Sequence, residues 1–275
     1  MGILDLPAFI NPVLSLSGFS KLALIAHSQG TTQTFVALAK QQRPDLGEKI
    51  SIFCSLAPAV YAGPLINKFY FKFMKIIPPS AFRIVFGIHA FIPFMMLMHR
   101  IVPGKLYGEL GYRVFWFLFG WTDTRWDCGL RARFFQFSPV FVSAEAMRWW
   151  LGRECFARHR CVLSTRSPDD RGRTDEENDS SPERGGGSWF DHRFPPLAMW
   201  VAGSDDLVDG RKLIRRFEEG KEPEVTVVWK KVVEEYEHLD VVWAVDAREK
   251  VFEEVADVVG RCVGGVGEGV VERRK

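Results

Sequence analysis

The chain has 275 residues, of which 47% are hydrophobic and 25% are charged. These proportions are ordinary for a globular protein and exclude collagen, a coiled coil and wholesale disorder. The formal net charge of +2 comes from 36 basic and 34 acidic residues, so no charge excess points to nucleic acid. Aromatic residues stand out at 13%, which suits a large core or a lipid-facing surface.

The first part of the chain, residues 1–62, shows the strand–helix–strand pattern of a parallel α/β sheet. An apolar run at 21–26 predicts a buried strand, and a helical pattern over 31–39 follows it. A second apolar run at 50–56 predicts the next strand. A parallel pair joined through a helix is the basic unit of α/β folds, so we expect this region to belong to an α/β core.

The rest of the chain divides by composition into four segments. Residues 63–166 are aromatic and interrupted by proline, which predicts an inserted helical cap. Residues 167–188 are polar and have few apolar side chains, so we expect a disordered loop. Residues 189–262 resume the α/β core, and residues 263–275 form a Gly-rich, flexible tail.

Within the returning core, two further strands, two helices and one core face are predicted. The strands lie at 197–203 and 225–229, and a helix is expected at about 210–218. Valines at helical spacing predict the core face of a closing helix. These valines are Val241, Val242, Val245, Val251 and Val255.

The cysteines do not indicate a disulfide scaffold or a metal site. They number five and are scattered, which argues against a disulfide framework. The nearest approach to a metal cluster is Cys155, His159 and Cys161, but no second ligand pair lies at zinc spacing. We therefore expect neither a metal nor a cofactor.

The strongest chemical motif is Ala-His-Ser-Gln-Gly at residues 26–30, between a predicted strand and a predicted helix. A nucleophile elbow needs this context, because the sharp turn lifts the serine above the sheet and leaves room only for small flanking residues. Ala26 and Gly30 are small. Ser28 is therefore the candidate nucleophile, and the backbone N–H of Gln29 is the candidate oxyanion donor. An ordinary serine in a small-residue turn is the alternative.

Two later residues can complete a catalytic triad. Asp205 follows the strand at 197–203, and His238 follows the strand at 225–229. The order Ser, Asp, His is that of α/β-hydrolases. The alternatives are a turn or helix-cap role for Asp205 and a helix-start role for His238. The remaining histidines are less suited as the base: His27, His89, His99, His159 and His192.

Several short motifs give the chain a wider resemblance. They are Asp-Leu-Pro-Ala at 5–8, Ala-His-Ser-Gln-Gly-Thr-Thr at 26–32, Leu-Ala-Pro-Ala at 56–59, Gly-Ser-Asp-Asp-Leu-Val-Asp at 203–209, His-Leu-Asp at 238–240 and Trp-Ala-Val-Asp-Ala at 243–247. With these motifs the chain resembles the acid lipase family of α/β-hydrolases: the gastric and lysosomal acid lipases and, more closely, the fungal lipases and steryl ester hydrolases.

The resemblance implies both a fold and an activity. The fold is the α/β-hydrolase fold, with a mostly parallel sheet and an inserted helical cap. The activity is cleavage of neutral lipid esters, triacylglycerol or steryl esters, through an acyl-enzyme. Ser28 is implied as nucleophile, Asp205 as acid and His238 as base, with the Gln29 N–H in the oxyanion hole and no cofactor or metal.

The position of the elbow departs from the family pattern. Only 27 residues precede Ser28, whereas the earlier strands and helices of this fold need about 100 residues. We expect the first strands and the loop with the second oxyanion donor to be missing, and the chain alone to be poorly soluble and weakly active or inactive. The alternative function is therefore a truncated, catalytically impaired lipase remnant that only associates with lipid surfaces.

The cap suggests a lipid-facing surface. Residues 84–99 carry no charged side chain except His, but a spanning helix needs about 20 residues, and Pro93 interrupts this run. We expect an apolar cap face that covers the active site and touches a lipid droplet or membrane; a membrane span and an ordinary core are the alternatives. The expected location is the lipid droplet or the endoplasmic reticulum membrane, or a secreted or lysosomal/vacuolar location if an N-terminal signal is missing.

Overall fold

Four parallel strands form the centre of the computed structural model, which describes residues 1–275 except 92–93, 138–140, 153–155, 164–186 and 264–275. The strands are β1 (Leu22–His27), β2 (Ile50–Leu56), β3 (Leu197–Ala202) and β4 (Val227–Val233). They are hydrogen-bonded in the order β1-β2-β3-β4, and each neighbouring pair is parallel. Most of the loop predicted at 167–188 and of the tail predicted at 263–275 lies outside the described residues.

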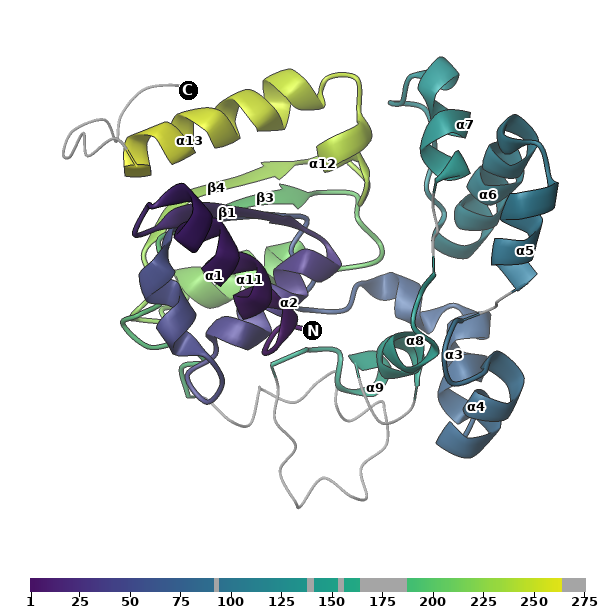
Figure 1. Ribbon diagram of the computed structural model, residues 1–275, viewed down its shortest axis with the longest axis horizontal. Helices are drawn as coiled ribbons and strands as arrows, with labels where there is room; N and C mark the ends of the chain where they lie inside the picture. The colour runs from purple at the N-terminus through teal and green to yellow at the C-terminus, as the bar shows by residue number, and fades with distance from the viewer. Residues whose placement is uncertain (92–93, 138–140, 153–155, 164–186, 264–275) are drawn as a thin grey trace.

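Helices cover both faces of this sheet, because successive side chains of the two central strands point to opposite sides. On β3, Leu197, Met199 and Val201 pack in one core cluster and Ala198, Trp200 and Ala202 pack in another. The first cluster takes side chains from α1 (Asp5–Ser17), α2 (Gln29–Leu38) and α11 (Gly210–Glu218), and the second from α13 (Glu253–Val263). Figure 1 shows α13 on one side of the sheet and α1, α2 and α11 on the other.

The segment between β2 and β3 is helical and lies beside the sheet (Figure 1). Its helices are α3 (Phe69–Ile76), α4 (Pro79–Phe86), α5 (Phe94–Ile101), α6 (Gly104–Phe119), α7 (Cys128–Gln136), α8 (Ala144–Leu151) and α9 (Phe156–His159). Short 3-10 turns at η1 (Pro44–Lys49) and η2 (Pro64–Asn67) precede them. Among the described helices, none combines the length and the apolar character required to cross a membrane.

The α/β-hydrolase fold is confirmed, and so are the strand at 50–56 and the helix at 210–218. The strand predicted at 225–229 is partly wrong, because β4 runs from Val227 to Val233. The second half of β4 includes Lys230 and Lys231, whose charges would be costly to bury in a central strand. In this edge strand their ammonium groups form ion pairs with Glu218 and Glu254.

The single closing helix predicted from the valines is also wrong. The chain forms α12 (Asp240–Trp243), a π-helical turn η4 (Arg248–Phe252) and then α13. Ala244 is extended, with φ −62° and ψ 144°, so the helical phase does not continue across it. Val241 and Val251 are fully buried as expected, whereas Val245 is 66% exposed.

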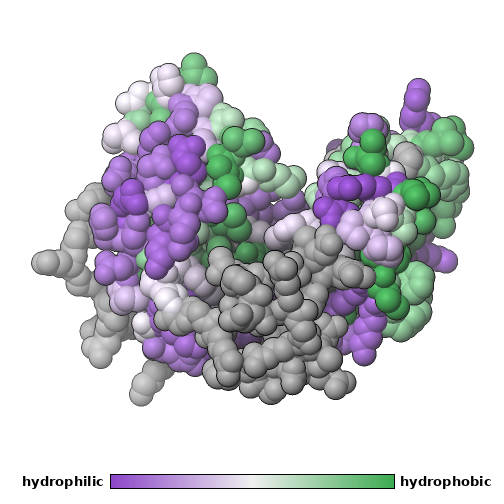
Figure 2. All heavy atoms as spheres, turned by 90° about the horizontal axis from the view of Figure 1, so that it is seen from below, coloured by the Kyte–Doolittle hydropathy of each residue, from purple (hydrophilic) through white to green (hydrophobic). Residues whose placement is uncertain are grey.

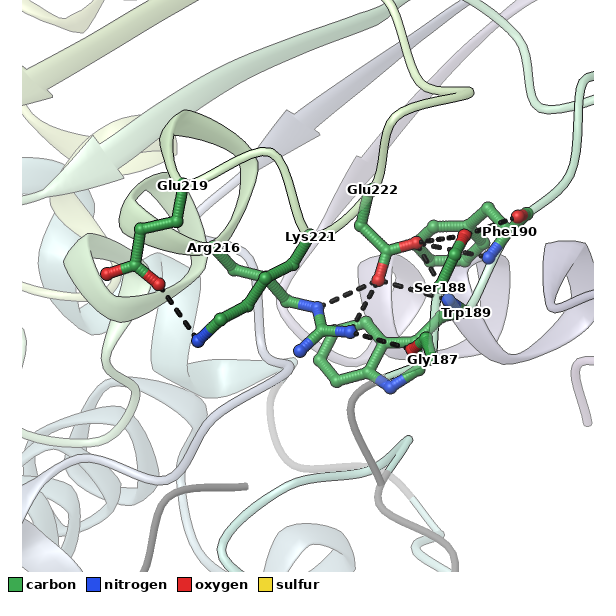
Figure 3. A network of polar contacts seen from close by, with 8 residues as sticks. All are labelled: Gly187, Ser188, Trp189, Phe190, Arg216, Glu219, Lys221 and Glu222. Carbon is green, nitrogen blue, oxygen red and sulfur yellow. Dashed lines mark hydrogen bonds and ion pairs between the residues drawn. The ribbon is translucent and has the colours of Figure 1, made fainter. Parts of the chain in front are cut away.

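A buried ion pair fixes the chain where it returns to the core at residue 187 (Figure 3). The Arg216 and Glu222 side chains are 4% and 0% exposed, and their nearest polar atoms are 2.6 Å apart. Glu222 also accepts hydrogen bonds from the Ser188 hydroxyl and the Trp189 N–H, while the Arg216 guanidinium lies 3.4 Å from the centre of the Trp189 ring. These contacts compensate the charges of both buried side chains. Removing either side chain would break this compensation.

Candidate active site

Ser28 occupies a sharp turn between β1 and α2. Its φ of 52° and ψ of −118° lie in a region that non-glycine residues rarely adopt. The Ser28 N–H donates to the carbonyl of Leu56 at the end of β2, over 3.1 Å. A Cβ at Gly30 would lie 3.4 Å from the Cβ of Ala26, so small residues on both sides let the turn close. This is the geometry predicted for a nucleophile elbow.

The structure brings Ser28, His238 and Asp205 into one hydrogen-bonded chain. The His238 Nε2 lies 2.6 Å from Ser28 Oγ, and its Nδ1 lies 2.6 Å from Asp205 Oδ2. The His238 and Asp205 side chains are each 2% exposed. With the Nδ1–H donated to the carboxylate, Nε2 is left to accept the serine proton.

Local backbone contacts set the position of Asp205. Its Oδ1 accepts the N–H groups of Leu207 at 2.8 Å and Val208 at 3.2 Å, which leaves Oδ2 for His238. The turn after β3 also runs very close to the end of β4, since a Cβ at Gly203 would lie 2.5 Å from the Cα of Glu234. Glycine at this position therefore lets the acid-bearing and histidine-bearing loops lie side by side.

His27 has a role that the sequence did not reveal. Its Nε2–H donates to the backbone carbonyl of His238 over 3.1 Å, and the two rings lie 5.2 Å apart between centroids. Burial first, and then the nearby charge of His238, lower the pKa of His27 to about 4. His27 is thus a neutral donor that supports the His238 loop, and no feature of the motif at residues 26–30 indicated this partner.

Among the other histidines, His99 lies in the cap, where its Nε2 is 2.8 Å from the carbonyl oxygen of Gln136. His89 and His192 are exposed, and His159 ends α9. Within the described part of the chain, no group of three potential metal ligands occurs, and Cys155 lies outside that part.

Gln29 is the first residue of α2. Its N–H therefore belongs to the first turn of a helix, where backbone donors are unpaired within the helix and the dipole favours negative charge. An oxyanion formed on an acyl group at Ser28 would develop beside this helix end. The oxyanion role of Gln29 stays a prediction.

Two acidic groups flank His238 in its loop, and burial is the largest influence on the pKa of each. Burial raises the pKa of Glu237, whose carboxylate accepts the N–H of Thr122 over 2.6 Å. Burial likewise raises the pKa of Asp240, which accepts the indole N–H of Trp126 over 2.7 Å. Both donors come from the cap, so the histidine loop is held by the cap as well as by the core.

The fold and this geometry define the class of protein: an α/β-hydrolase with a serine at its nucleophile elbow. No protein-family model matches the chain. Among curated proteins, the chain is 36% identical over 269 residues to sterol esterase 2 of Saccharomyces cerevisiae. This alignment covers 90% of the chain and 48% of the yeast protein.

Two animal enzymes are similar over 271 and 273 residues. The chain is 25% identical to gastric triacylglycerol lipase of Homo sapiens and 26% identical to lysosomal acid lipase/cholesteryl ester hydrolase of Rattus norvegicus. Each alignment covers 93% of this chain and 62% of the relative. The solved monoacylglycerol lipase of Paleococcus ferrophilus aligns over 94% of this chain and 76% of its own, at 15% identity and a TM-score of 0.45.

The predicted resemblance to the acid lipases and sterol esterases is thereby confirmed. All three curated relatives are named as hydrolases of carboxylic esters. The chain spans 48% of the length of the yeast relative and 62% of the two animal relatives.

Proposed function

We propose that the chain is a carboxylic ester hydrolase that acts on neutral lipids through Ser28, His238 and Asp205. The observation that carries the proposal is the continuous hydrogen-bonded chain from the Asp205 carboxylate through the His238 imidazole to the Ser28 hydroxyl, with 2.6 Å at each link. A buried carboxylate, an imidazole and a hydroxyl in this order are suited to activating a nucleophile.

The proposed reaction has two halves. In the first, His238 takes the proton from Ser28 Oγ as the oxygen attacks the ester carbonyl, and then gives that proton to the departing alcohol. In the second, water attacks the acyl-enzyme, His238 takes its proton, and the proton returns to Ser28 Oγ as the fatty acid leaves. Asp205 stabilises the imidazolium that forms in each half, and the Gln29 N–H donates to the oxyanion.

The relatives support neutral lipid esters as the substrate class. Their names specify a sterol esterase, a triacylglycerol lipase and a cholesteryl ester hydrolase. Triacylglycerol and steryl esters share a long apolar acyl chain, which suits a cap rich in aromatic side chains. The aromatic cluster next to His238 includes Trp121, Trp126 and Phe135, each at most 7% exposed.

Exposed apolar stripes on the cap support a lipid surface as the partner. On α6 the stripe consists of Leu106, Leu110, Val114 and Phe117, each 48–60% exposed. Phe115 and Phe119 lie on the other side of α6 and pack into the aromatic cluster. The stripe therefore faces away from the catalytic side, and Figure 2 shows hydrophobic surface on the outer side of the cap lobe.

Two other cap helices also expose an apolar stripe. We propose the surface of a lipid droplet or of the endoplasmic reticulum as the location. On α3 and α5, exposed apolar residues recur at spacings of three or four: Phe69, Phe73, Ile76, Phe94, Leu97 and Ile101. Helices with one exposed apolar side bind at the boundary between lipid headgroups and acyl chains.

Hydrolysis of emulsified triolein and cholesteryl oleate tests the proposed activity, with Ser28→Ala as the control. The proposal expects release of oleate by the wild-type chain and none by the folded variant. Equal release by both would contradict Ser28 as the nucleophile. No release by a folded wild-type chain would favour the remnant that only associates with lipid.

Flotation with the same emulsions tests the lipid surface separately, because it needs no turnover. In the Ser28→Ala background, we expect Leu110→Ser with Phe117→Ser to reduce the floating fraction severalfold. Leu16→Ser is the matched control, since Leu16 is 89% exposed on α1 of the core. Equal loss in the control would show that any exposed apolar residue suffices and would contradict a binding face on the cap.

A further inference from the structure

The cap segment 121–126 forms hydrogen bonds with the loop that carries His238. We call this segment the clasp. The Thr122 N–H and hydroxyl donate to the two carboxylate oxygens of Glu237, over 2.6 Å and 3.1 Å. The residue that follows Glu237 in the chain is His238. The clasp therefore contacts the loop immediately before the proposed base.

A second set of bonds lies on the other side of His238. The indole N–H of Trp126 donates to Asp240 Oδ1 over 2.7 Å, while Asp240 Oδ2 accepts the Glu237 N–H over 2.8 Å. Further along, the Val245 N–H donates to the carbonyl of Arg125 over 2.9 Å. The loop is thus fixed by the clasp from both sides of its histidine.

Trp121, the first residue of the clasp, contacts the imidazole itself. The two ring planes are 9° from parallel and their centroids are 5.7 Å apart. Trp121 is 7% exposed, and it is held in place by the ring of Phe119, stacked on it at 4.4 Å. Gly120 ends α6 with a φ of 77°, the left-handed conformation that turns the chain toward the core at this point.

This stacking has a consequence for a ring whose charge changes. A cation over an indole face within about 6 Å of its centre is stabilised by the ring quadrupole, most strongly where water is excluded. Neutral imidazole gains much less. The other titratable groups near the His238 ring are Asp205, which also favours the cation, and His27, which is neutral. Glu237 and Asp240 lie on the same loop, and their carboxylates are bonded to the clasp.

We infer that Trp121 is a positioning residue for the proposed hydrolysis: its indole holds the His238 ring and stabilises the imidazolium over the neutral form. The catalytic consequence rests on the proposed function, since an imidazolium forms there when Ser28 loses its proton. The effect on His238 itself does not depend on turnover. The cap therefore contributes to the chemistry of the triad.

The effect on His238 is measured by NMR titration of ¹⁵N-labelled imidazoles in the Ser28→Ala background. The chain has six histidines, and His238→Gln identifies the signals that belong to His238. Trp121→Leu removes the aromatic face, so we expect the pH midpoint of those signals to fall by about 0.5–1 unit. Trp121→Phe keeps a weaker aromatic face and should give a smaller fall. Trp116→Leu is the control, since Trp116 is a 54% exposed tryptophan on α6.

Kinetics with a short soluble ester measure the catalytic consequence. We expect Trp121→Leu to lower kcat by about 5- to 30-fold, with partial rescue in Trp121→Phe and little change in KM. A role in packing alone would lower thermal stability in both variants without moving the midpoint.

The inference is overturned if a folded Trp121→Leu protein titrates at His238 as the wild type does. If the leucine variant does not fold, a folded Trp121→Phe protein with an unchanged midpoint overturns it equally. A shifted midpoint in a chain that hydrolyses no ester would retain the inference about His238 and reject the proposed function, so the two failures are distinct.

Discussion

Replacing Asp205 by Asn tests the electrostatic and tautomeric role that the geometry gives this carboxylate. Asp205 Oδ2 lies 2.6 Å from His238 Nδ1 and both side chains are 2% exposed. An amide at this position can donate its N–H to Nδ1, which moves the imidazole proton to Nε2 and removes the acceptor that faces Ser28. The buried imidazolium would also lose its counter-charge. For a loss of this kind we expect kcat to fall by ~10⁴, equivalent to about 5.5 kcal/mol.

The assay is hydrolysis of p-nitrophenyl butyrate by purified wild-type and Asp205→Asn proteins, with circular dichroism to establish that both are folded. Asp206→Asn is the matched control, because Asp206 is the exposed neighbour on the same turn, and we expect its rate to stay within about threefold of the wild type. A folded Asp205→Asn protein that keeps more than about a tenth of the wild-type kcat would refute the assignment of Asp205 as the partner of His238.

The remaining predictions concern stability. His27 binds a proton near pH 6.5 in the unfolded chain and near pH 4 in the folded one, so the unfolded state holds more protons between these values. The free energy of unfolding should therefore decrease from pH 6.5 to pH 4 by up to about 3 kcal/mol from this residue. Urea titrations should show a weaker decrease for His27→Gln than for the wild type, whereas the exposed His192→Gln should show the wild-type decrease. An equal decrease in all three proteins would contradict burial of a neutral His27. Glu222→Ala removes the carboxylate that forms the ion pair with the buried Arg216 guanidinium, so urea denaturation should show a loss of about 3–5 kcal/mol. Glu219→Ala breaks only the exposed pair with Lys221 and should change little, whereas equal losses would contradict the buried network.

The elements that carry the triad could be predicted from the sequence because their signals are local. The apolar runs at 21–26 and 197–203 match β1 and β3 to within one residue, and the small residues around Ser28 indicated a turn that the structure contains. The order of Ser28, Asp205 and His238, each after an apolar run, was enough to predict that the ends of parallel strands bring them together. Two local signals were misleading: Lys230 and Lys231 concealed the continuation of an edge strand to Val233, and regular valine spacing concealed the break at Ala244.

The support around the triad could not be predicted because it joins residues far apart in the chain. Trp121 and His238 are separated by more than a hundred positions, and nothing in the motif around either residue specifies the other. The bond from His27 to the carbonyl of His238 depends on how the end of β1 meets the loop that follows β4. Such contacts follow from tertiary packing, for which a single sequence holds no periodic signal.

Labelling with a fluorophosphonate, followed by mass spectrometry of the modified peptide, tests the catalytic assignment most directly. This reagent forms a covalent bond with a serine only where a neighbouring base activates it. We predict one adduct, on Ser28, that is absent in Ser28→Ala and strongly reduced in His238→Gln. A folded wild-type chain that forms no adduct, or that carries its adduct on another serine, would contradict the catalytic role of Ser28.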